Sequence, residues 1–536
     1  MFFKKNSQDV IYFIIFILLI VQILLFKNSL FSHWSHILDQ DVTLVYNALL
    51  LSSNINQEYL DHPAYTTINN LNFIFRILNF FNLIEVHNID NLIQAKNKDQ
   101  SLQILHNISQ IVQVSYSYTL LILIYFIVNE IIDDKFSSFI LCLVCLFSPS
   151  YLFLLELIRS EILSLILLLL YFICLSKYQK GENKYLIFSG FFFILSLLAK
   201  IQIIIVIFPL LILNYLINLN SKFKKDNIRF SKYIIILFNF FIIIFLIYFL
   251  DNYQYKRVDK ILFIFFIFFH FIYFYLSDRK IFLNFNLNFS LLLFLIGCCS
   301  AIIFFKICNY FELSSFHPVL TSIIGSPITQ MGNINTGYQT SSIDNLAFIS
   351  KIYNFFIYSI IEGSHFGRNE YEYKNAFILV FNKLSNLTYI LSILISIYCI
   401  FRKKYLILLL ILFLNISITL INFVFNFRPY NFYLIYSLPL NLILVSVILK
   451  VIKFKKISSI IFLLFYLYLS FSELKFYLNN PRVNDYPIKN MEQICLSENI
   501  NNKNSYMSYW QKKYDVKFLS ELCADYNINY KSFLKE

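Results

Sequence analysis

The sequence predicts an all-α polytopic membrane protein, and three observations support this fold class. Of the 536 residues, 58% are hydrophobic and only 14% are charged, whereas soluble domains carry about 25% charged residues. The mean hydropathy is +0.65. Apolar runs of membrane-crossing length recur along the chain, and clusters of Lys and Arg separate many of them.

A helix needs roughly 17 to 25 apolar residues to cross about 30 Å of hydrocarbon. We expect about thirteen such helices, and they define a transmembrane domain at residues 1–472. The expected segments are 10–30, 111–131, 137–155, 157–176, 185–199, 201–218, 232–250, 260–276, 287–307, 386–401, 404–425, 431–450 and 456–472.

The basic residues predict the orientation of the bundle. If the N-terminus is cytoplasmic, nearly every basic cluster falls on the same side, as the positive-inside rule requires. The net charge of +13 is then largely an orientation signal, and we do not expect a nucleic-acid partner. The clusters are DDK (133–135), SKYQKGENK (176–184), SKFKKDNIRFSK (221–232), SDRK (277–280), FRKK (401–404) and KVIKFKK (450–456).

Three polar segments are expected on the exoplasmic side: the loops 31–110 and 308–385, and a small C-terminal tail at 473–536. The first apolar run has no small-residue cleavage site, so we expect a retained signal anchor. Cys495 and Cys523 lie in the tail, where they form a disulfide or stay free thiols. Function is expected in these segments because the polar residues are concentrated there.

Acidic residues follow the first apolar run directly. Asp39 and Asp41 lie in LDQDVTLVYNALL, which continues with a helix-like apolar pattern suited to the membrane interface. Asp61 and His62 lie in EYLDHPAYTT, just before a second amphipathic stretch. An Asp at a helix start accepts backbone N–H bonds, so simple capping is the alternative interpretation of the first pair.

These motifs resemble the GT-C class of membrane glycosyltransferases, which includes the protein O-mannosyltransferases and the lipid A aminoarabinose transferases. Such enzymes begin with one transmembrane helix and a long exoplasmic loop that carries an acidic pair, a Tyr-containing helix and an HPP or KPP step. Asp39 and Asp41 match the acidic pair, and His62-Pro63 matches the HP step. Ala64 replaces the second Pro. The motifs cover about residues 30 to 85.

The resemblance implies that a sugar is transferred, with inversion, from a polyprenyl phosphate to a lipid, glycan or protein acceptor. Asp39 or Asp41 would be the general base, a role worth roughly 10²–10⁴-fold in rate, and Asp39 is preferred because it stands first. No cofactor is required, although the DxD sequence leaves a divalent metal possible. The expected location is the bacterial inner membrane, with the active site facing the periplasm.

A departing phosphate gains negative charge, so the site needs cations near it. Arg159, Lys200 and Arg428 each stand alone at a predicted helix end on the exoplasmic side, and we expect them to converge near Asp39. The alternative for each cation is snorkelling toward the phosphates of surrounding membrane lipids.

The exoplasmic segments supply further candidates. EGSHFGRNEYEY in the 308–385 loop carries His365 and Arg368, which could shape the acceptor site or position the donor, or could equally be solvated loop residues. The expected substrate-binding residues are Asp61, His62, Arg159, Glu161, Lys200, His365, Arg368, Arg428 and Tyr430.

Two other functions stay open. O-antigen ligases and polymerases also place a His- and Arg-bearing exoplasmic loop late in the chain and use polyprenyl-pyrophosphate donors, but they do not characteristically carry an acidic pair after the first helix. A lipid or solute transporter would commonly show two related halves and helices broken by Gly or Pro. This chain has 8 Gly and no evident halves, so a transferase is favoured.

Overall fold

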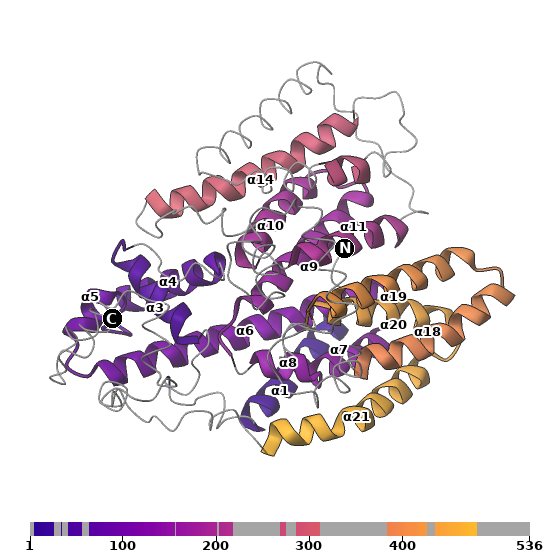
Figure 1. Ribbon diagram of the computed structural model, residues 1–536, viewed down its shortest axis with the longest axis horizontal. Helices are drawn as coiled ribbons and strands as arrows, with labels where there is room; N and C mark the ends of the chain where they lie inside the picture. The colour runs from indigo at the N-terminus through magenta and orange to yellow at the C-terminus, as the bar shows by residue number, and fades with distance from the viewer. Residues whose placement is uncertain are drawn as a thin grey trace, which may run out of the picture.

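The computed structural model describes a helical bundle (Figure 1). Every regular element within the described residues is a helix, as the sequence predicts. The described residues are 5–25, 34, 41–55, 64–155, 157–200, 203–217, 268–274, 286–310, 383–425 and 435–479.

The α-helices keep the labels of Figure 1. They are α1 (Lys5–Leu25), α3 (Asp41–Ser52), α4 (Tyr65–Phe80), α5 (Ile89–Gln94), α6 (Lys98–Ile132), α7 (Lys135–Leu146), α8 (Pro149–Leu155), α9 (Ser160–Gln179), α10 (Tyr185–Ala199), α11 (Ile204–Ile217), α14 (Asn286–Tyr310), α18 (Lys383–Phe401), α19 (Tyr405–Phe425), α20 (Leu438–Val451) and α21 (Lys455–Asn479).

Among the described residues, three helices are long and apolar enough to cross a membrane: α6, α9 and residues Leu384–Phe401 of α18. The shorter apolar helices include α7, α10 and α20. This composition is compatible with a membrane protein. The predicted segment 232–250 lies outside the described residues, and only 268–274 of the predicted segment 260–276 is described. The number of spans therefore stays a prediction.

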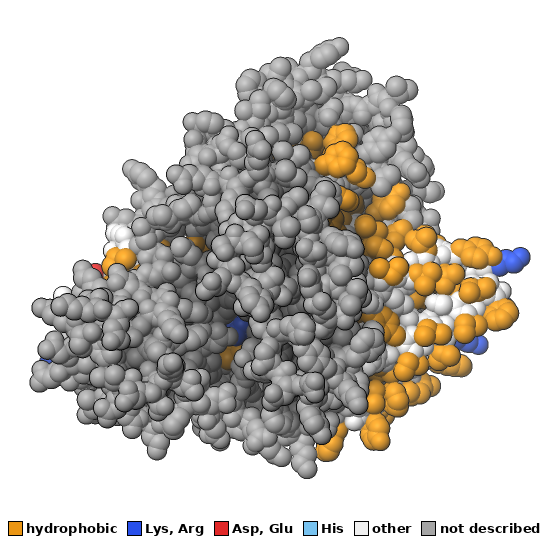
Figure 2. Space-filling model, in the orientation of Figure 1, with side chains coloured by type: hydrophobic (Ala, Val, Ile, Leu, Met, Phe, Trp, Pro, Cys, Tyr) orange, Lys and Arg blue, Asp and Glu red, His pale blue; other side chains and the backbone are white. Residues whose placement is uncertain are grey.

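The surface of α18, α19 and α21 is apolar. Figure 2 shows hydrophobic side chains over the side of the molecule where these helices lie in Figure 1. Ile393, Leu409 and Leu464 are 61%, 51% and 60% exposed. A helix facing water carries polar residues on its outer face, so this surface suits lipid.

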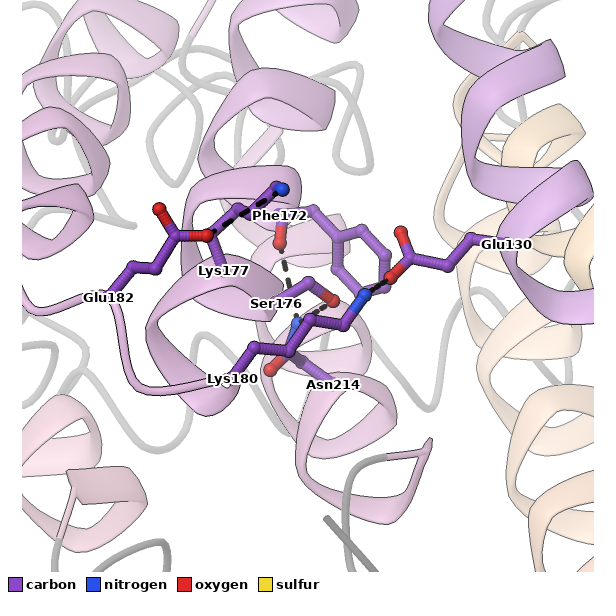
Figure 3. Close-up of polar contacts among 7 residues, drawn as sticks. All are labelled: Glu130, Phe172, Ser176, Lys177, Lys180, Glu182 and Asn214. Atoms are coloured by element: carbon purple, nitrogen blue, oxygen red, sulfur yellow. Dashed lines mark hydrogen bonds and ion pairs between the residues drawn. The ribbon is translucent and has the colours of Figure 1, made fainter. Parts of the chain in front are cut away.

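Several lysines lie at one end of the bundle. At this end, Lys455 Nζ donates a hydrogen bond of 2.8 Å to the carbonyl oxygen of Ile132 at the end of α6. Lys180, just after α9, pairs with Glu130 at the same end of α6 (Figure 3). We call this the basic end, since the α9–α10 and α20–α21 connections there carry several lysines. The opposite end is the α3–α5 end.

Helix α6 is longer than the sequence predicted. The predicted apolar segment 111–131 lies within this helix, which begins earlier, at Lys98, where the Asn97 side chain accepts a hydrogen bond from the N–H of Gln100. Its 35 residues correspond to about 52 Å at 1.5 Å per residue, beyond the roughly 30 Å of hydrocarbon. Polar residues in the first turns lower the local hydropathy, which hid this extension.

The first half of α6 is the centre of a small helical cluster. Helices α3 and α5 pack against it, α4 packs against α3, and all three share a second core with Leu102 and Leu105. The sequence predicted an interfacial amphipathic helix at α3, but the side chains from Leu44 to Leu51 are buried on every face. Helix α3 is therefore enclosed by its neighbours.

The predicted segment 137–155 is two helices. Helix α7 ends at Leu146 and α8 begins at Pro149. Proline lacks an N–H and disfavours helical geometry in the residue before it, so Ser148 interrupts the helix.

Two other ends differ from their predicted positions. Helix α20 begins at Leu438 instead of 431, and α21 continues to Asn479 past the predicted end of the membrane domain at 472. The tail with Cys495 and Cys523 lies outside the described residues.

Helices α10 and α14 make a close crossing. An added Cβ on Gly190 would lie 2.0 Å from the carbonyl oxygen of Phe294, and one on Gly297 would lie 2.0 Å from that of Ile187. Only the missing side chains allow the two backbones to touch, a common device where helices pack in membranes.

Candidate functional site

Three of the predicted site residues have described side chains: Arg159, Glu161 and Lys200. Asp41 is the first residue of α3, but its side chain is outside the described part of the chain. The other predicted site residues also lie outside it: Asp39, Asp61, His62, His365, Arg368, Arg428 and Tyr430.

The structure brings Arg159, Glu161 and Lys200 together, and we call them the buried charge cluster. Lys200 Nζ lies 3.1 Å from Glu161 Oε1. Arg159 Nη1 lies 3.8 Å from the same oxygen. The side chain of Glu161 therefore lies between the two cations. Helix α9 runs toward the basic end and α10 runs back from it. The cluster therefore lies at the opposite end of this pair, where the start of α9 meets the end of α10.

The local structure suits these charges. Arg159 is the extended residue before α9, and Glu161 lies in the first turn of that helix. Lys200 follows the last residue of α10, and its backbone N–H bonds to the carbonyl oxygen of Ser196. A carboxylate near a helix start and a cation near a helix end both interact favourably with the helix dipole.

The cluster is removed from solvent. Arg159 is 2% exposed, and Glu161 and Lys200 are 0% exposed. Charged side chains are almost never buried unless they are paired. Two buried cations, Arg159 and Lys200, share the carboxylate of Glu161.

The cluster also has spare hydrogen-bonding capacity. Lys200 and Glu161 Oε1 form an ion pair, and within the described part of the chain the second Glu161 oxygen and the Ser160 hydroxyl have no hydrogen-bond partner. Backbone N–H groups at a helix start, together with nearby cations, form a favourable environment for phosphate and other anions. The arrangement can therefore hold a buried anion at the start of α9.

Helix α4 adds a tyrosine that sequence reasoning did not single out. Tyr65 is the first residue of α4, directly after the HPA step, and it is 5% exposed. Burial raises the pKa of Tyr65 far above its usual value, so the hydroxyl stays protonated. The next residue ties this helix start to α10, since Thr66 Oγ1 donates to the carbonyl oxygen of Leu195 at 3.2 Å.

Helix α6 contributes a buried polar face. Each member lies three or four residues from at least one other member, which places them on one side of the helix. This spacing was visible in the sequence but went unnoticed, because the residues lie in or beside an apolar run. The buried polar residues are His106, Ser109, Gln110, Gln113 and Ser117.

No group of three or more His, Cys, Asp or Glu side chains gathers among the described residues. Since Asp39 lies outside them, a metal at the DxD sequence stays a prediction.

Comparison of the chain with protein-family models, with curated proteins and with solved structures finds no match.

Proposed function

We propose that the chain is an integral membrane glycosyltransferase of the GT-C class, which uses a polyprenyl-phosphate sugar as donor and an exoplasmic lipid, glycan or protein as acceptor. The observation that carries this proposal is the buried charge cluster. Arg159 and Lys200 come from different helices and meet on Glu161 in a site closed to water. Two buried cations beside a helix start suit a phosphate.

The positive-inside rule supports the orientation. It assigns the basic end to the cytoplasm, so the cluster and the α3–α5 end would face the exoplasm. In a bacterium this is the periplasmic side of the inner membrane. A phosphate carried on a lipid tail could then reach the start of α9 from the bilayer.

Each residue has a defined part in the proposed reaction. Lys200 and Arg159 hold the donor phosphate and stabilise the charge that develops on it as its bond to the anomeric carbon breaks. Asp39 takes the proton of the acceptor group as that group attacks the anomeric carbon from the opposite face. The products are an inverted glycoside and a free polyprenyl phosphate.

The general-base assignment has a direct test. The protein is placed in proteoliposomes with undecaprenyl phosphates bearing a hexose, an N-acetylhexosamine or an aminopentose, and sugar transfer to added membrane extract is measured. We expect Asp39→Asn to lower turnover by roughly 10²–10⁴-fold with donor binding retained.

Asp90→Asn is the matched control, because Asp90 lies in α5 at the same end of the bundle and accepts a hydrogen bond from Ser53. Full turnover in both Asp39→Asn and Asp41→Asn would refute the assignment of the base. Movement of the lipid across the bilayer without covalent transfer would favour a transporter.

A further inference from the structure

Four polar side chains on α4 and α6 carry buried hydrogen-bonding atoms that no group of the described residues satisfies. The unsatisfied atoms are the hydroxyl of Tyr65, the amide nitrogen and oxygen of Asn69, the amide nitrogen and oxygen of Gln110, and the amide oxygen of Gln113. Gln110 and Gln113 are each 1% exposed. Protein interiors satisfy nearly all of their buried polar groups, so these atoms require an explanation.

The four side chains come from two helices, α4 and α6. Tyr65 and Asn69 are four residues apart on α4, and Gln110 and Gln113 are three apart on α6, so each pair shares one helix face. The amide of Asn70 donates to the hydroxyl of Tyr116, which joins α4 to α6 beside these pairs.

Both helices are tied to the segments that carry the cations. Gln113 Nε2 donates to the carbonyl oxygen of Leu154 at 3.1 Å, five residues before Arg159. Thr66 Oγ1 donates to the carbonyl oxygen of Leu195 at 3.2 Å, five residues before Lys200. These two bonds hold α6 against the segment that leads to Arg159 and hold the start of α4 against the last turns of α10, which Lys200 follows.

The chemistry of the four groups differs from that of the cluster. A phenol hydroxyl and a carboxamide are neutral, and each offers both a donor and an acceptor. A phosphate only accepts hydrogen bonds, and a polyprenyl tail does neither. Sugar hydroxyls both donate and accept, so a carbohydrate matches the four groups and a phosphate matches the cations.

We infer that Tyr65, Asn69, Gln110 and Gln113 form a carbohydrate subsite that binds the sugar hydroxyls of the donor while the charge cluster holds its phosphate. This inference rests on the proposed glycosyltransferase function. The inference predicts an effect that a structural role would not produce. An apolar residue of the same size at Gln110 removes a buried unsatisfied amide, so the substitution should not destabilise the empty protein. The same substitution should weaken sugar binding.

The test is a binding measurement on the full chain in nanodiscs. Affinity is measured for bare undecaprenyl phosphate and for undecaprenyl phosphates bearing a hexose, an N-acetylhexosamine, a pentose or an aminopentose. The variants are Gln110→Met, Asn69→Leu as a second subsite variant, and Lys200→Met. Ser109→Ala is the control, because Ser109 is buried on the same helix but its hydroxyl already donates to the carbonyl oxygen of Leu105.

We expect the wild type to bind at least one sugar-bearing lipid more tightly than the bare one. Gln110→Met and Asn69→Leu should each reduce that advantage about tenfold, with affinity for bare undecaprenyl phosphate and the unfolding temperature of the empty protein maintained. A wild type without any sugar preference, or subsite variants that keep it in full, would overturn the inference. Lys200→Met should weaken binding of both lipids, and if it weakens neither, the proposed function itself fails.

Discussion

The buried charge cluster makes a testable prediction about stability. Glu161 lies between two cations, so removing it and removing one cation should have different costs. The two changes are Glu161→Gln, which leaves Arg159 and Lys200 without the carboxylate between them, and Lys200→Met, which leaves an Arg–Glu pair. The double variant completes a thermodynamic cycle.

The distances set the size of the effect. At an effective dielectric constant of about 20, the 3.1 Å contact of Lys200 with Glu161 corresponds to an attraction of about 5 kcal/mol. The 3.8 Å contact with Arg159 corresponds to about 4 kcal/mol. Desolvation offsets much of this, so we expect Glu161→Gln to lower the free energy of unfolding by about 4 kcal/mol and Lys200→Met by about 2 kcal/mol.

The free energy of unfolding of the double variant should fall by about 4 kcal/mol, less than the sum of the two single effects. The difference is a coupling energy of about 2 kcal/mol between Glu161 and Lys200. The assay is unfolding by SDS in mixed micelles. Lys177→Met is the matched control: Lys177 lies 3.7 Å from Glu182, at the other end of α9, where Glu182 is exposed (Figure 3). A pair of this kind is worth about 1 kcal/mol or less. Equal costs for the two single changes, or strict additivity, would refute the reasoning.

Two further predictions concern the packing of the bundle. Gly190→Ala should separate α10 from α14, because the added Cβ would lie 2.0 Å from the Phe294 carbonyl oxygen. In the same SDS titration this change should lower the free energy of unfolding by about 2 kcal/mol. An unchanged unfolding midpoint would contradict the close crossing. Tyr273→Phe removes a hydroxyl that accepts a hydrogen bond from Gln179 and donates one to Asn214. It should lower the free energy of unfolding by about 1 kcal/mol. An unchanged free energy of unfolding would show that this network does not hold the helices together.

Much of the helical layout was readable from the sequence, because hydropathy is a local property. The adjacent segments predicted at 185–199 and 201–218 are separate helices, Tyr185–Ala199 and Ile204–Ile217, and Lys200 follows the first of them. The start of α6 was not readable in this way, since its first turns are polar and become ordered by packing against α3, α4 and α5.

The candidate site was readable in part. Lone charges at the ends of apolar runs pointed to Arg159 and Lys200, and the short connection between α9 and α10 brings them to the same end of the bundle. Their meeting on Glu161 depends on side-chain geometry that spacing cannot supply. The unsatisfied amides of Gln110 and Gln113 were missed for a related reason: a pattern of residues does not show which buried polar atoms find partners.

The most direct test of the account is native mass spectrometry of the protein extracted gently from its own membrane. The proposal places a polyprenyl phosphate, with or without its sugar, on the buried charge cluster. We predict that the wild type and the Lys177→Met control carry a bound lipid of that mass and that Lys200→Met has lost it. Ordinary phospholipids alone on the wild type, or the same polyprenyl lipid retained by Lys200→Met, would contradict the central claim.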